Sequence, residues 1–387
     1  MRIAIIGQKG IPATFGGVEK HVEALAIRLG KAGHEVIVYT RAWYAAPQKH
    51  FSKGVRTVVT PTVKSKHLDA IVHTLTSTLH AIFLGVDIIH YHGVGPALLS
   101  WIPRLLSPST KVVATFHSID RKHQKWGLIA RVMLRLGEKA ACTFPHETIV
   151  VSRGLQEYCR KHYGRDTHFL PNGVQAASKK SGTDAIRQFG LKKDGYIAMV
   201  SRLIPLKGAH YLIAAYKLLK RRGLTAGKNL VIIGDSAFSD AYVAKLRDLA
   251  KDDQDIVFTG YLSGKPLHQA FSNAYAVVHP SEFEGMPIAI LEAMSYGKTV
   301  VSSDIPGNLE VTRVHGVNFK SKDVNDMADK LAYVIANPKF AKAKGAAARD
   351  FVMANYQWDD IARQTAAIYE LLLAGNACRH LSLRTHP

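Results

Sequence analysis

Short apolar runs alternate along the chain with longer segments in which apolar residues recur every three or four positions. Short runs bounded by glycine or polar residues are typical of buried parallel strands, and the longer periodic segments are typical of helices packed on a sheet. We therefore predict an α/β fold. The predicted strands are 2–6, 35–39, 87–92, 111–116 and 148–151 in the first half, and 196–200, 229–233, 256–259, 276–279 and 299–302 in the second.

The segment 68–83 has the most regular helical period of the first half. The apolar residues that lie on one face of this predicted helix are Leu68, Ile71, Val72, Leu75, Leu79, Ile82 and Phe83. A stripe of this kind normally packs against a core. We therefore expect it to cover the first sheet.

The two halves are separated by a polar stretch at 174–183 that contains Lys, Ser and Gly and is typical of a linker. We predict a Rossmann-like domain over 1–173, a second over 184–355 and a final helical segment over 356–374. The 387 residues, with 47% hydrophobic content, are sufficient for two complete cores.

The segment HPSEFEGMPIAILEAMSYG, residues 279–297, combines two carboxylates with an almost entirely apolar helix. Pro287 suits the first helical turn, and Gly297 suits the left-handed residue that follows a helix end. Glu292 is then an acid on a buried helix, which is unfavourable unless a partner bonds it. If the segment is mostly helical, the Cα atoms of Glu284 and Glu292 are about 12 Å apart, from a rise of about 1.5 Å per residue.

That separation suits an extended ligand with an anion at its centre. The amides at the helix N-terminus favour a phosphate, and the two carboxylates can accept hydrogen bonds from hydroxyls on either side. A nucleotide-sugar has this layout. Two other interpretations stay open: a buried Glu bonded to a backbone amide or a Lys, and a pair of hydrolase carboxylates, which need carboxyl groups roughly 5 to 9.5 Å apart.

Two cations follow the predicted strand 196–200, in the sequence SRLIPLKG. Arg202 and Lys207 lie beyond the carboxyl end of this strand and before a predicted helix, where α/β sheets bind their ligands. Together they match a diphosphate held between them. Either cation alone is equally consistent with a surface charge.

The loop after the first strand, GQKGIPATFGG, is rich in glycine and opens a helix at about Val18. Gly16 and Gly17 would let backbone amides approach a phosphate or a sugar, although an ordinary tight turn explains the same pair. The pattern is not GxGxxG, so a dinucleotide site is not favoured.

His117 follows the predicted strand 111–116, again at the carboxyl end. There it can contact a donor or position an acceptor hydroxyl, or it can serve as a hydrogen-bonded structural residue. No Asp, Glu or His residues have the spacing of metal ligands, so we expect no metal ion. The cysteines, Cys142, Cys159 and Cys378, have neither metal nor disulfide spacing, which favours a reducing cytoplasm.

The formal charge is +21, from 51 Lys and Arg against 30 Asp and Glu. A field of this sign attracts nucleotide phosphates, nucleic acid or acidic lipid headgroups. The segment 121–136 mixes Arg and Lys with Trp, Leu, Ile and Met, which is typical of a helix on an anionic membrane and also of a basic face over a packed apolar one. Without a run of about 20 apolar residues or a signal peptide, we expect a cytoplasmic protein, peripheral on the inner face of the cell membrane.

Five separated motifs occur in a fixed order: FGGVE, PNGV, SRLIPLKG, the loop after Gly234, and SEFEGMPIAILEAMSYG. With this set the chain closely resembles the family 4 retaining glycosyltransferases of the GT-B fold over nearly its whole length. The opening loop and HSIDRKHQKWG resemble bacterial enzymes of extracellular polysaccharide and O-antigen synthesis. The resemblance implies two Rossmann-like domains facing a central cleft, with the last helix crossing back to the N-terminal domain.

The resemblance also implies roles for particular residues. Arg202 and Lys207 would bind the donor diphosphate and stabilise the leaving group. Glu292 would bind the ribose hydroxyls, and Glu284 and His117 would lie near the donor sugar. The catalytic residues expected on this basis are His117, Arg202, Lys207 and Glu284. The further residues expected to contact the donor are Gly16, Gly17, Gly285, Met286, Pro287 and Ile288.

The implied reaction moves a hexose from a nucleotide-diphosphate sugar to a polyprenyl-diphosphate-linked or polysaccharide acceptor. It would proceed with retention and without a metal or cofactor, and a UDP-sugar is favoured over a GDP- or dTDP-sugar. A nucleotide-sugar hydrolase or phosphorylase on the same fold is the alternative enzyme. A non-catalytic protein that binds nucleic acid or an anionic membrane would rest on the charge alone and leaves both carboxylates unexplained, and we expect no nucleic-acid partner.

Overall fold

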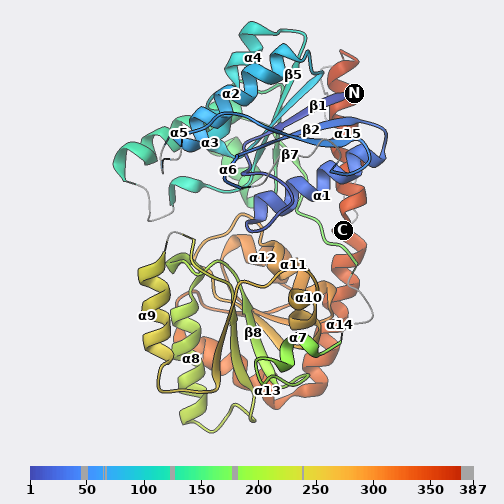
Figure 1. Cartoon of the computed structure of the whole chain (residues 1–387). Coiled ribbons are helices and arrows are strands. Elements are labelled where there is room, and N and C mark those ends of the chain that lie inside the picture. The colour runs from blue at the N-terminus through green and yellow to red at the C-terminus, as the bar shows by residue number, and fades with distance from the viewer. Residues whose placement is uncertain are drawn as a thin grey trace. The chain divides into compact units, whose positions relative to one another are not determined.

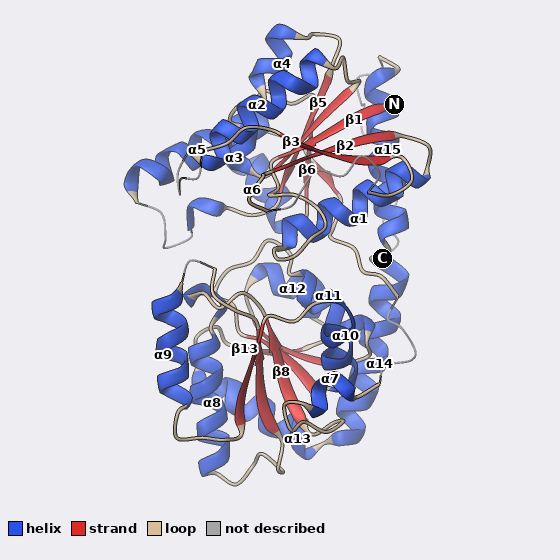
Figure 2. Cartoon of the chain, viewed as in Figure 1, coloured by secondary structure: helices blue, strands red, loops and turns tan. Residues whose placement is uncertain are grey.

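The computed structural model describes residues 1–44, 51–63, 65, 68–122, 127–176, 182–237 and 239–375. The chain forms two compact units, one made of Met1–Asn172 with the segment from Trp358 onward, the other of Gly173–Gln357. Each unit is a parallel β-sheet between layers of helices (Figure 1, Figure 2). Among the helices described, none is both long enough and apolar enough to cross a membrane.

The sheet of the first unit has the strand order β3-β2-β1-β4-β5-β6-β7, with all neighbours parallel. Its strands are β1 (Arg2–Ile6), β2 (Glu35–Thr40), β3 (Val55–Val59), β4 (Ile88–His92), β5 (Lys111–Phe116), β6 (Glu147–Val150) and β7 (His168–Phe169). The chain builds outward from β1 to β3 and then returns to place β4 on the other side of β1. The carboxyl ends of β1 and β4 therefore form a topological switch point, where α/β sheets bind ligands.

The helices of this unit are α1 (Gly17–Lys31), α2 (Asp69–Phe83), α3 (Val94–Ala97), α4 (Trp101–Leu106), α5 (Leu128–Thr143), α6 (Arg153–Tyr163) and the last helix of the chain, α15 (Trp358–Leu373). The helix α15 lies beside α1 (Figure 1). Its Ile368, Tyr369 and Leu372 belong to the buried cluster that contains the apolar face of α1, and Arg28 pairs with Asp359 at 2.5 Å. The predicted return of the last helix to the N-terminal domain is confirmed.

The sheet of the second unit has the order β10-β9-β8-β11-β12-β13, also parallel. Its strands are β8 (Tyr196–Val200), β9 (Asn229–Ile233), β10 (Ile256–Gly260), β11 (Ala276–His279), β12 (Thr299–Ser303) and β13 (Val317–Phe319). Its helices are α7 (Asp184–Arg187), α8 (Ala209–Arg221), α9 (Asp240–Ala250), α10 (Gly264–Asn273), α11 (Ile288–Ser295), α12 (Pro306–Thr312), α13 (Val324–Ala336) and α14 (Pro338–Asn355). The switch point here lies between β8 and β11.

The chain enters and leaves the second unit at one place. Val174 and Gln357 form a parallel bridge, and the amide of Val174 donates to the carbonyl of Tyr356 over 2.7 Å. The second unit is thus a continuous segment whose two ends are hydrogen-bonded to each other.

The predicted α/β fold is confirmed, and each strand predicted from an apolar run is present with bounds that differ by at most one residue. Three strands were not predicted. β7 and β13 have only two and three residues, too few to give a pattern. β3 contains Arg56 and Thr57 and is preceded by Lys53 and Gly54, so its apolar signal is weak.

The expectation that the apolar stripe of 68–83 covers the sheet is wrong. The buried side chains of α2 are His73, Thr74, Ser77, Thr78 and Ala81, whereas Phe83 is 86% exposed. Thr78 shares a 2.8 Å hydrogen bond with the hydroxyl of Tyr91, and Ser77 shares one of 2.7 Å with Thr60. Small hydroxyl side chains let the helix pack closely on the sheet while bonding to it, and this leaves the apolar stripe facing outward.

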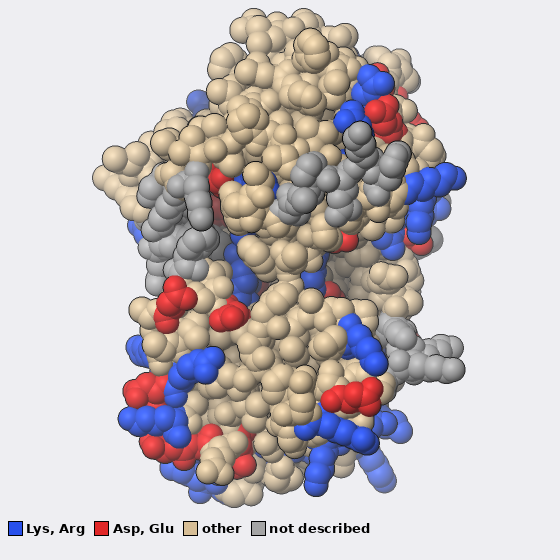
Figure 3. All heavy atoms as spheres, viewed as in Figure 1, with Lys and Arg blue, Asp and Glu red and all other residues tan. Residues whose placement is uncertain are grey.

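The surface over α2 and α4 is correspondingly poor in charge (Figure 3). The helix α4, which contacts α2, exposes Trp101, Leu105 and Leu106. On α2 the exposed apolar side chains include Leu75, Leu79 and Phe83.

Candidate functional site

A charged cluster occupies the switch point of the second unit, on the loops that follow β8 and β11. Lys207 ends the short 3₁₀ turn Pro205–Lys207 and forms an ion pair with Glu284. His279, the last residue of β11, donates from Nε2 to Oε1 of Glu284 over 2.9 Å. The side chains of Lys207 and Glu284 are only 14% and 11% exposed, so the pair is largely shielded from water.

Burial and charge act in opposite directions on this cluster. Burial raises the pKa of Glu284, but the Lys207 ammonium and the bond from His279 outweigh it and hold that pKa well below its usual range. For Lys207, burial lowers the pKa, Glu284 opposes this, and the nearby Arg202 adds to the lowering. Within the described ranges, no hydrogen bond or ion pair engages the guanidinium of Arg202. One cation of the cluster is therefore fixed by a carboxylate and the other is available to an anion.

Close backbone contacts hold the two loops together. The amide of Glu282 donates to the carbonyl of Leu206 over 2.8 Å. Gly208 has a φ of 72°, and a Cβ there would overlap the carbonyl oxygen of Pro280. A Cβ on Gly307 would likewise overlap the carbonyl oxygen of Glu284. Glycine is needed at both positions because only a residue without Cβ permits these approaches.

Helix α11 begins at Ile288, and Pro287 is the residue that precedes it. Gly285, Met286 and Pro287 are buried, whereas Ile288 and Glu292 are half-buried. Because residues 280–287 form a loop, the predicted 12 Å separation, which assumed a mostly helical segment, does not apply.

The predicted left-handed residue after this helix is confirmed at Gly297, which has a φ of 68°. Tyr296, just before it, has a pKa raised to about 12 by burial and by the negative charge of Glu292. Glu292 therefore lies close to this ring, on the helix that follows the charged loop.

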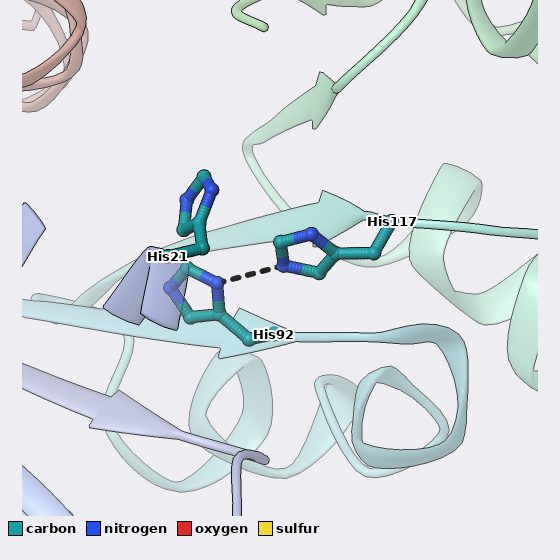
Figure 4. A group of neighbouring side chains, drawn as sticks. All are labelled: His21, His92 and His117. Atoms are coloured by element: carbon teal, nitrogen blue, oxygen red, sulfur yellow. Dashed lines mark hydrogen bonds between the residues drawn. The ribbon is translucent and has the colours of Figure 1, made fainter. Parts of the chain in front are cut away.

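Three histidines meet near the switch point of the first unit (Figure 4). His92 is the last residue of β4, His117 directly follows β5, and His21 lies on α1. Nδ1 of His92 and Nε2 of His117 are 3.0 Å apart, and Nδ1 of His21 is 2.8 Å from Oδ1 of Asn172. One nitrogen from each ring lies within 4.8 Å of the other two.

Burial keeps these imidazoles neutral. It lowers the pKa of His21 to about 4 and the pKa values of His92 and His117 well below the ordinary value. Sequence reasoning placed His117 at a strand end but missed His21 and His92, because the three belong to different segments. The available signal was their position: His92 ends the apolar run IIHYH, and His21 shares the buried face of α1 with Val22 and Leu25.

The glycine loop of the first unit has its own carboxylate. Gly16 precedes α1 with a φ of 105°, and a Cβ there would overlap the carboxylate of Glu19. Glu19 is buried and accepts a 3.1 Å hydrogen bond from the amide of Lys9. An anion that approaches Gly16 and the exposed Gly17 therefore meets Glu19 at the start of the helix.

Several residues singled out from the sequence lie outside the described ranges: residues 123–126 of the basic segment and Cys378. The remaining cysteines, Cys142 and Cys159, are buried and form no disulfide.

Two family models match successive parts of the chain. The model described as "Glycosyltransferase Family 4" matches residues 15–178, and that described as "Glycosyl transferases group 1" matches residues 183–351. Together they cover both units apart from the termini.

Similar proteins have the same type of activity in their names. An uncharacterized glycosyltransferase of Methanocaldococcus jannaschii is 26% identical over 96% of this chain and 99% of its own length. A GDP-mannose-dependent alpha-(1-6)-phosphatidylinositol monomannoside mannosyltransferase of Mycobacterium tuberculosis is 24% identical over 92% of this chain and 94% of its own. The solved structure of sucrose-phosphate synthase from Thermosynechococcus elongatus has a TM-score of 0.81 at 25% identity and covers 97% of this chain and 99% of its own.

The two parallel sheets, the returning last helix, the family models and these relatives agree. The chain belongs to the family 4 glycosyltransferases and has the GT-B fold.

Proposed function

We propose that this glycosyltransferase transfers a hexose from a nucleotide-diphosphate sugar to a lipid-linked or polysaccharide acceptor in cell-surface glycan synthesis. It would act with retention and without a metal ion, at the cytoplasmic face of a membrane. The observation that carries the proposal is the charged cluster of Arg202, Lys207 and Glu284 at the β8–β11 switch point.

The cluster suits the stabilisation of a diphosphate leaving group. Negative charge grows on the diphosphate as the bond to the sugar breaks, and cations already in position lower the barrier because they need no reorganisation. Lys207 is held in place by Glu284, and the guanidinium of Arg202 offers a planar pair of donors for phosphate oxygens.

The state of Glu284 supports retention by same-face attack rather than through a covalent intermediate. Its carboxylate is paired with Lys207 and accepts a hydrogen bond from His279, and both contacts lower its pKa. A carboxylate stabilised in this way is a weak nucleophile. A donor phosphate oxygen would then take the proton of the acceptor hydroxyl.

The nucleotide would lie toward α11, with the ribose hydroxyls bonded by Glu292. A ribose with both hydroxyls offers this carboxylate two donors, whereas the deoxyribose of a dTDP-sugar offers one fewer. We favour a UDP-sugar as the donor. The mycobacterial relative is described as GDP-mannose-dependent, so a GDP-sugar is the first alternative to test.

Membrane association is supported by α5. Its exposed apolar side chains are Leu128, Ile129, Val132, Met133 and Leu136, and the first two are 80% and 81% exposed. Arg131, Arg135 and Lys139 are exposed on the same helix, and its one acid, Glu138, is buried. A helix with exposed apolar residues and basic but no exposed acidic groups is suited to an anionic bilayer surface.

Arg121, the first residue of the basic segment, also pairs with a buried acid. Its guanidinium donates to Glu138 over 3.0 Å and to the hydroxyl of Tyr158 over 2.9 Å. It therefore neutralises a buried acid. The basic residues to test for membrane binding are accordingly Arg131 and Arg135.

The first experiment measures sugar transfer by Arg202→Ala and Lys207→Ala variants, with UDP-, GDP-, dTDP- and ADP-sugars as donors. Each change should lower kcat by 10²–10³-fold, as loss of a preorganised donor does. Arg222→Ala, which removes a surface cation paired with Asp329, is the matched control and should be normal. Near-normal turnover by both site variants would contradict the proposal. Sugar release that does not depend on an acceptor would favour the hydrolase.

The second experiment measures binding to liposomes of anionic and of neutral lipid at several salt concentrations. Changing Arg131 and Arg135 to Gln should weaken binding about fivefold per residue at low salt, from roughly 1 kcal/mol for each cation. Changing Leu128 and Ile129 to Ser should remove the part of the liposome binding that persists at high salt. Leu224→Ser, an exposed apolar position in the other unit, is the control. Equal binding to neutral and anionic liposomes would point to a soluble acceptor.

A further inference from the structure

The three histidines of the first unit form a compact group without a carboxylate. The ring centroids of His21 and His117 are 4.8 Å apart, and those of His92 and His117 and of His21 and His92 are each 5.3 Å apart. Figure 4 shows His92 and His117 pointing toward each other, with His21 beside them. The three rings come from a helix and two strand ends of one unit, so their geometry is set by a single core.

The hydrogen bonds around the group leave ring nitrogens ready for a ligand. The side-chain oxygen of Asn172 can only accept a hydrogen bond, so Nδ1 of His21 is the donor and the other nitrogen of His21 carries a lone pair. In metal sites, histidine ligands usually donate their second N–H to an oxygen in this way. Nε2 of His92 is fully buried and has no partner among the described residues. It is the nitrogen on the far side of the ring from His117, so it can carry the ring proton while Nδ1 binds a ligand.

We propose that His21, His92 and His117 form a site for a divalent transition metal ion of the Zn²⁺ type. Neutral imidazole nitrogens suit Zn²⁺, Co²⁺ and Ni²⁺, whereas Mg²⁺ and Ca²⁺ prefer oxygen ligands, which this group lacks.

The spacing is close to what such an ion requires. Nitrogens that each lie about 2.0–2.1 Å from a tetrahedral ion are about 3.3 Å apart. His92 and His117 are already at 3.0 Å, and His21 needs a small rotation from within 4.8 Å. One of the two facing nitrogens, Nδ1 of His92 or Nε2 of His117, now carries the proton of their hydrogen bond. When an ion binds, this proton moves to the other nitrogen of the same ring. Both facing nitrogens then become ligands. His117 is only half-buried, which leaves room for water as the fourth ligand.

The ion would occupy a lone pair of His117. If His117 acts near the donor sugar, as the proposed function implies, then metal binding inhibits transfer. This consequence rests on the proposed function, but the existence of the site does not. Binding is therefore tested first, without an activity assay.

The experiment uses the untagged full chain, stripped of metal by a chelator and titrated with Zn²⁺, Co²⁺ and Mg²⁺ by calorimetry. We expect one Zn²⁺ per chain, bound at least tenfold more tightly than Mg²⁺. Bound Co²⁺ should show the visible absorption of a tetrahedral site. His21→Gln, His92→Gln and His117→Gln should each weaken Zn²⁺ binding at least tenfold and remove the Co²⁺ bands. Asn172→Asp should tighten binding, because a carboxylate makes the His21 ligand more basic.

Two control variants separate this site from other groups. His162→Gln removes an exposed histidine, and Cys142→Ser removes one member of the buried thiol pair. Both should keep the ion. If His92→Gln does not fold, the variants His117→Gln, at a half-buried position, and Asn172→Asp still test the proposal. Zn²⁺ binding no tighter than Mg²⁺, or binding lost in Cys142→Ser and retained in all three histidine variants, would overturn the proposal. A Zn²⁺-bound protein with full transfer activity would contradict only the role of His117.

Discussion

The two switch points of this protein have the same topology and opposite chemistry. In each unit the first strand is flanked by a later strand on the side where the order reverses, and chemically active side chains gather at the carboxyl ends. The second unit places there an ion pair and an arginine whose guanidinium pairs with none of the described residues, and the first places neutral imidazoles. Topology thus sets where a ligand can bind, while the residues after each strand decide which ligand it is.

The two sites also tolerate burial in different ways. Lys207 and Glu284 stay charged because they neutralise each other, and Glu284 has the further bond from His279. His21, His92 and His117 of the first unit lose their charge instead, as their lowered pKa values show. The first arrangement holds a charge ready for an anion, and the second holds lone pairs.

The largest effect on stability is expected from unpairing the charged site. Glu284→Ala leaves Lys207 buried without its partner and should lower the free energy of unfolding of the second unit by about 3–5 kcal/mol. Replacing both residues by Met should recover a large part of this loss, because it removes the buried charge. Urea unfolding measures both effects. A loss below about 1 kcal/mol in Glu284→Ala would show that water reaches the pair freely.

A pH titration should distinguish the two units. His73 of α2 is fully buried, and this burial lowers its pKa to about 4. The charge of Arg41 also lowers this pKa, and the charge of Asp69 raises it. The unfolded chain binds this proton near pH 6.5, so the stability contributed by neutral His73 is present above pH 6.5. It is lost as the pH falls toward 4, by about 3 kcal/mol in total. For Glu284 the pKa is also lowered, and its contribution is lost only below about pH 4.5.

Hydrogen exchange at pH 7 and pH 5 measures this difference unit by unit. Amides of the first unit should be less protected from exchange at pH 5 than at pH 7. In His73→Met this loss of protection should be smaller, because the part caused by protonation of His73 is removed. An unchanged loss in His73→Met would show that His73 is protonated without strain.

A pair of glycines tests how tightly the charged loops are held. Gly208 and Gly223 have φ values of 72° and 70°, but only Gly208 has a carbonyl oxygen against its missing side chain. Gly223→Ala should cost about 1 kcal/mol for the left-handed backbone. Gly208→Ala should cost about 2 kcal/mol more from overpacking and should also weaken nucleotide-sugar binding. Equal thermal unfolding shifts for the two variants would show that the loop moves aside.

The smallest effect should separate the two acids of the second unit. Glu292→Gln should weaken binding of nucleotide-sugar and free nucleotide by about tenfold, about the value of one or two hydrogen bonds. Glu284→Gln should weaken the nucleotide-sugar or its turnover and leave free nucleotide unchanged. Calorimetry with UDP and UDP-sugar measures both. The same loss of UDP affinity in both variants would contradict the division of roles.

The sequence predicted the strands and the charged loops well because each depends on local pattern. A short apolar run defines a buried strand, and Arg202, Lys207 and Glu284 lie in the loops that follow two such runs. The buried face of a helix and the contacts between segments far apart in the sequence were harder to predict. The period of 68–83 identified a helix but not which face is buried. The small side chains of Thr78 and Ala81 pack more closely on the sheet than leucine would, and the hydroxyl of Thr78 bonds Tyr91 of β4.

The histidine group could not be predicted from spacing, since His21, His92 and His117 come together only when three segments fold. The carboxylate of Glu19 against Gly16 is another such case. The glycine pattern indicated space for a ligand, and the tertiary structure places an acid there.

The return of α15 to the first unit has a consequence for how the chain is made. The second unit is complete once Gln357 has left the ribosome, and its ends are already hydrogen-bonded to each other. The first unit lacks Tyr369, which bonds the buried His90 over 2.7 Å, until the segment that follows Gln357 has been made. Domains generally fold as units during synthesis. The part of the chain made first is therefore the part that finishes folding last.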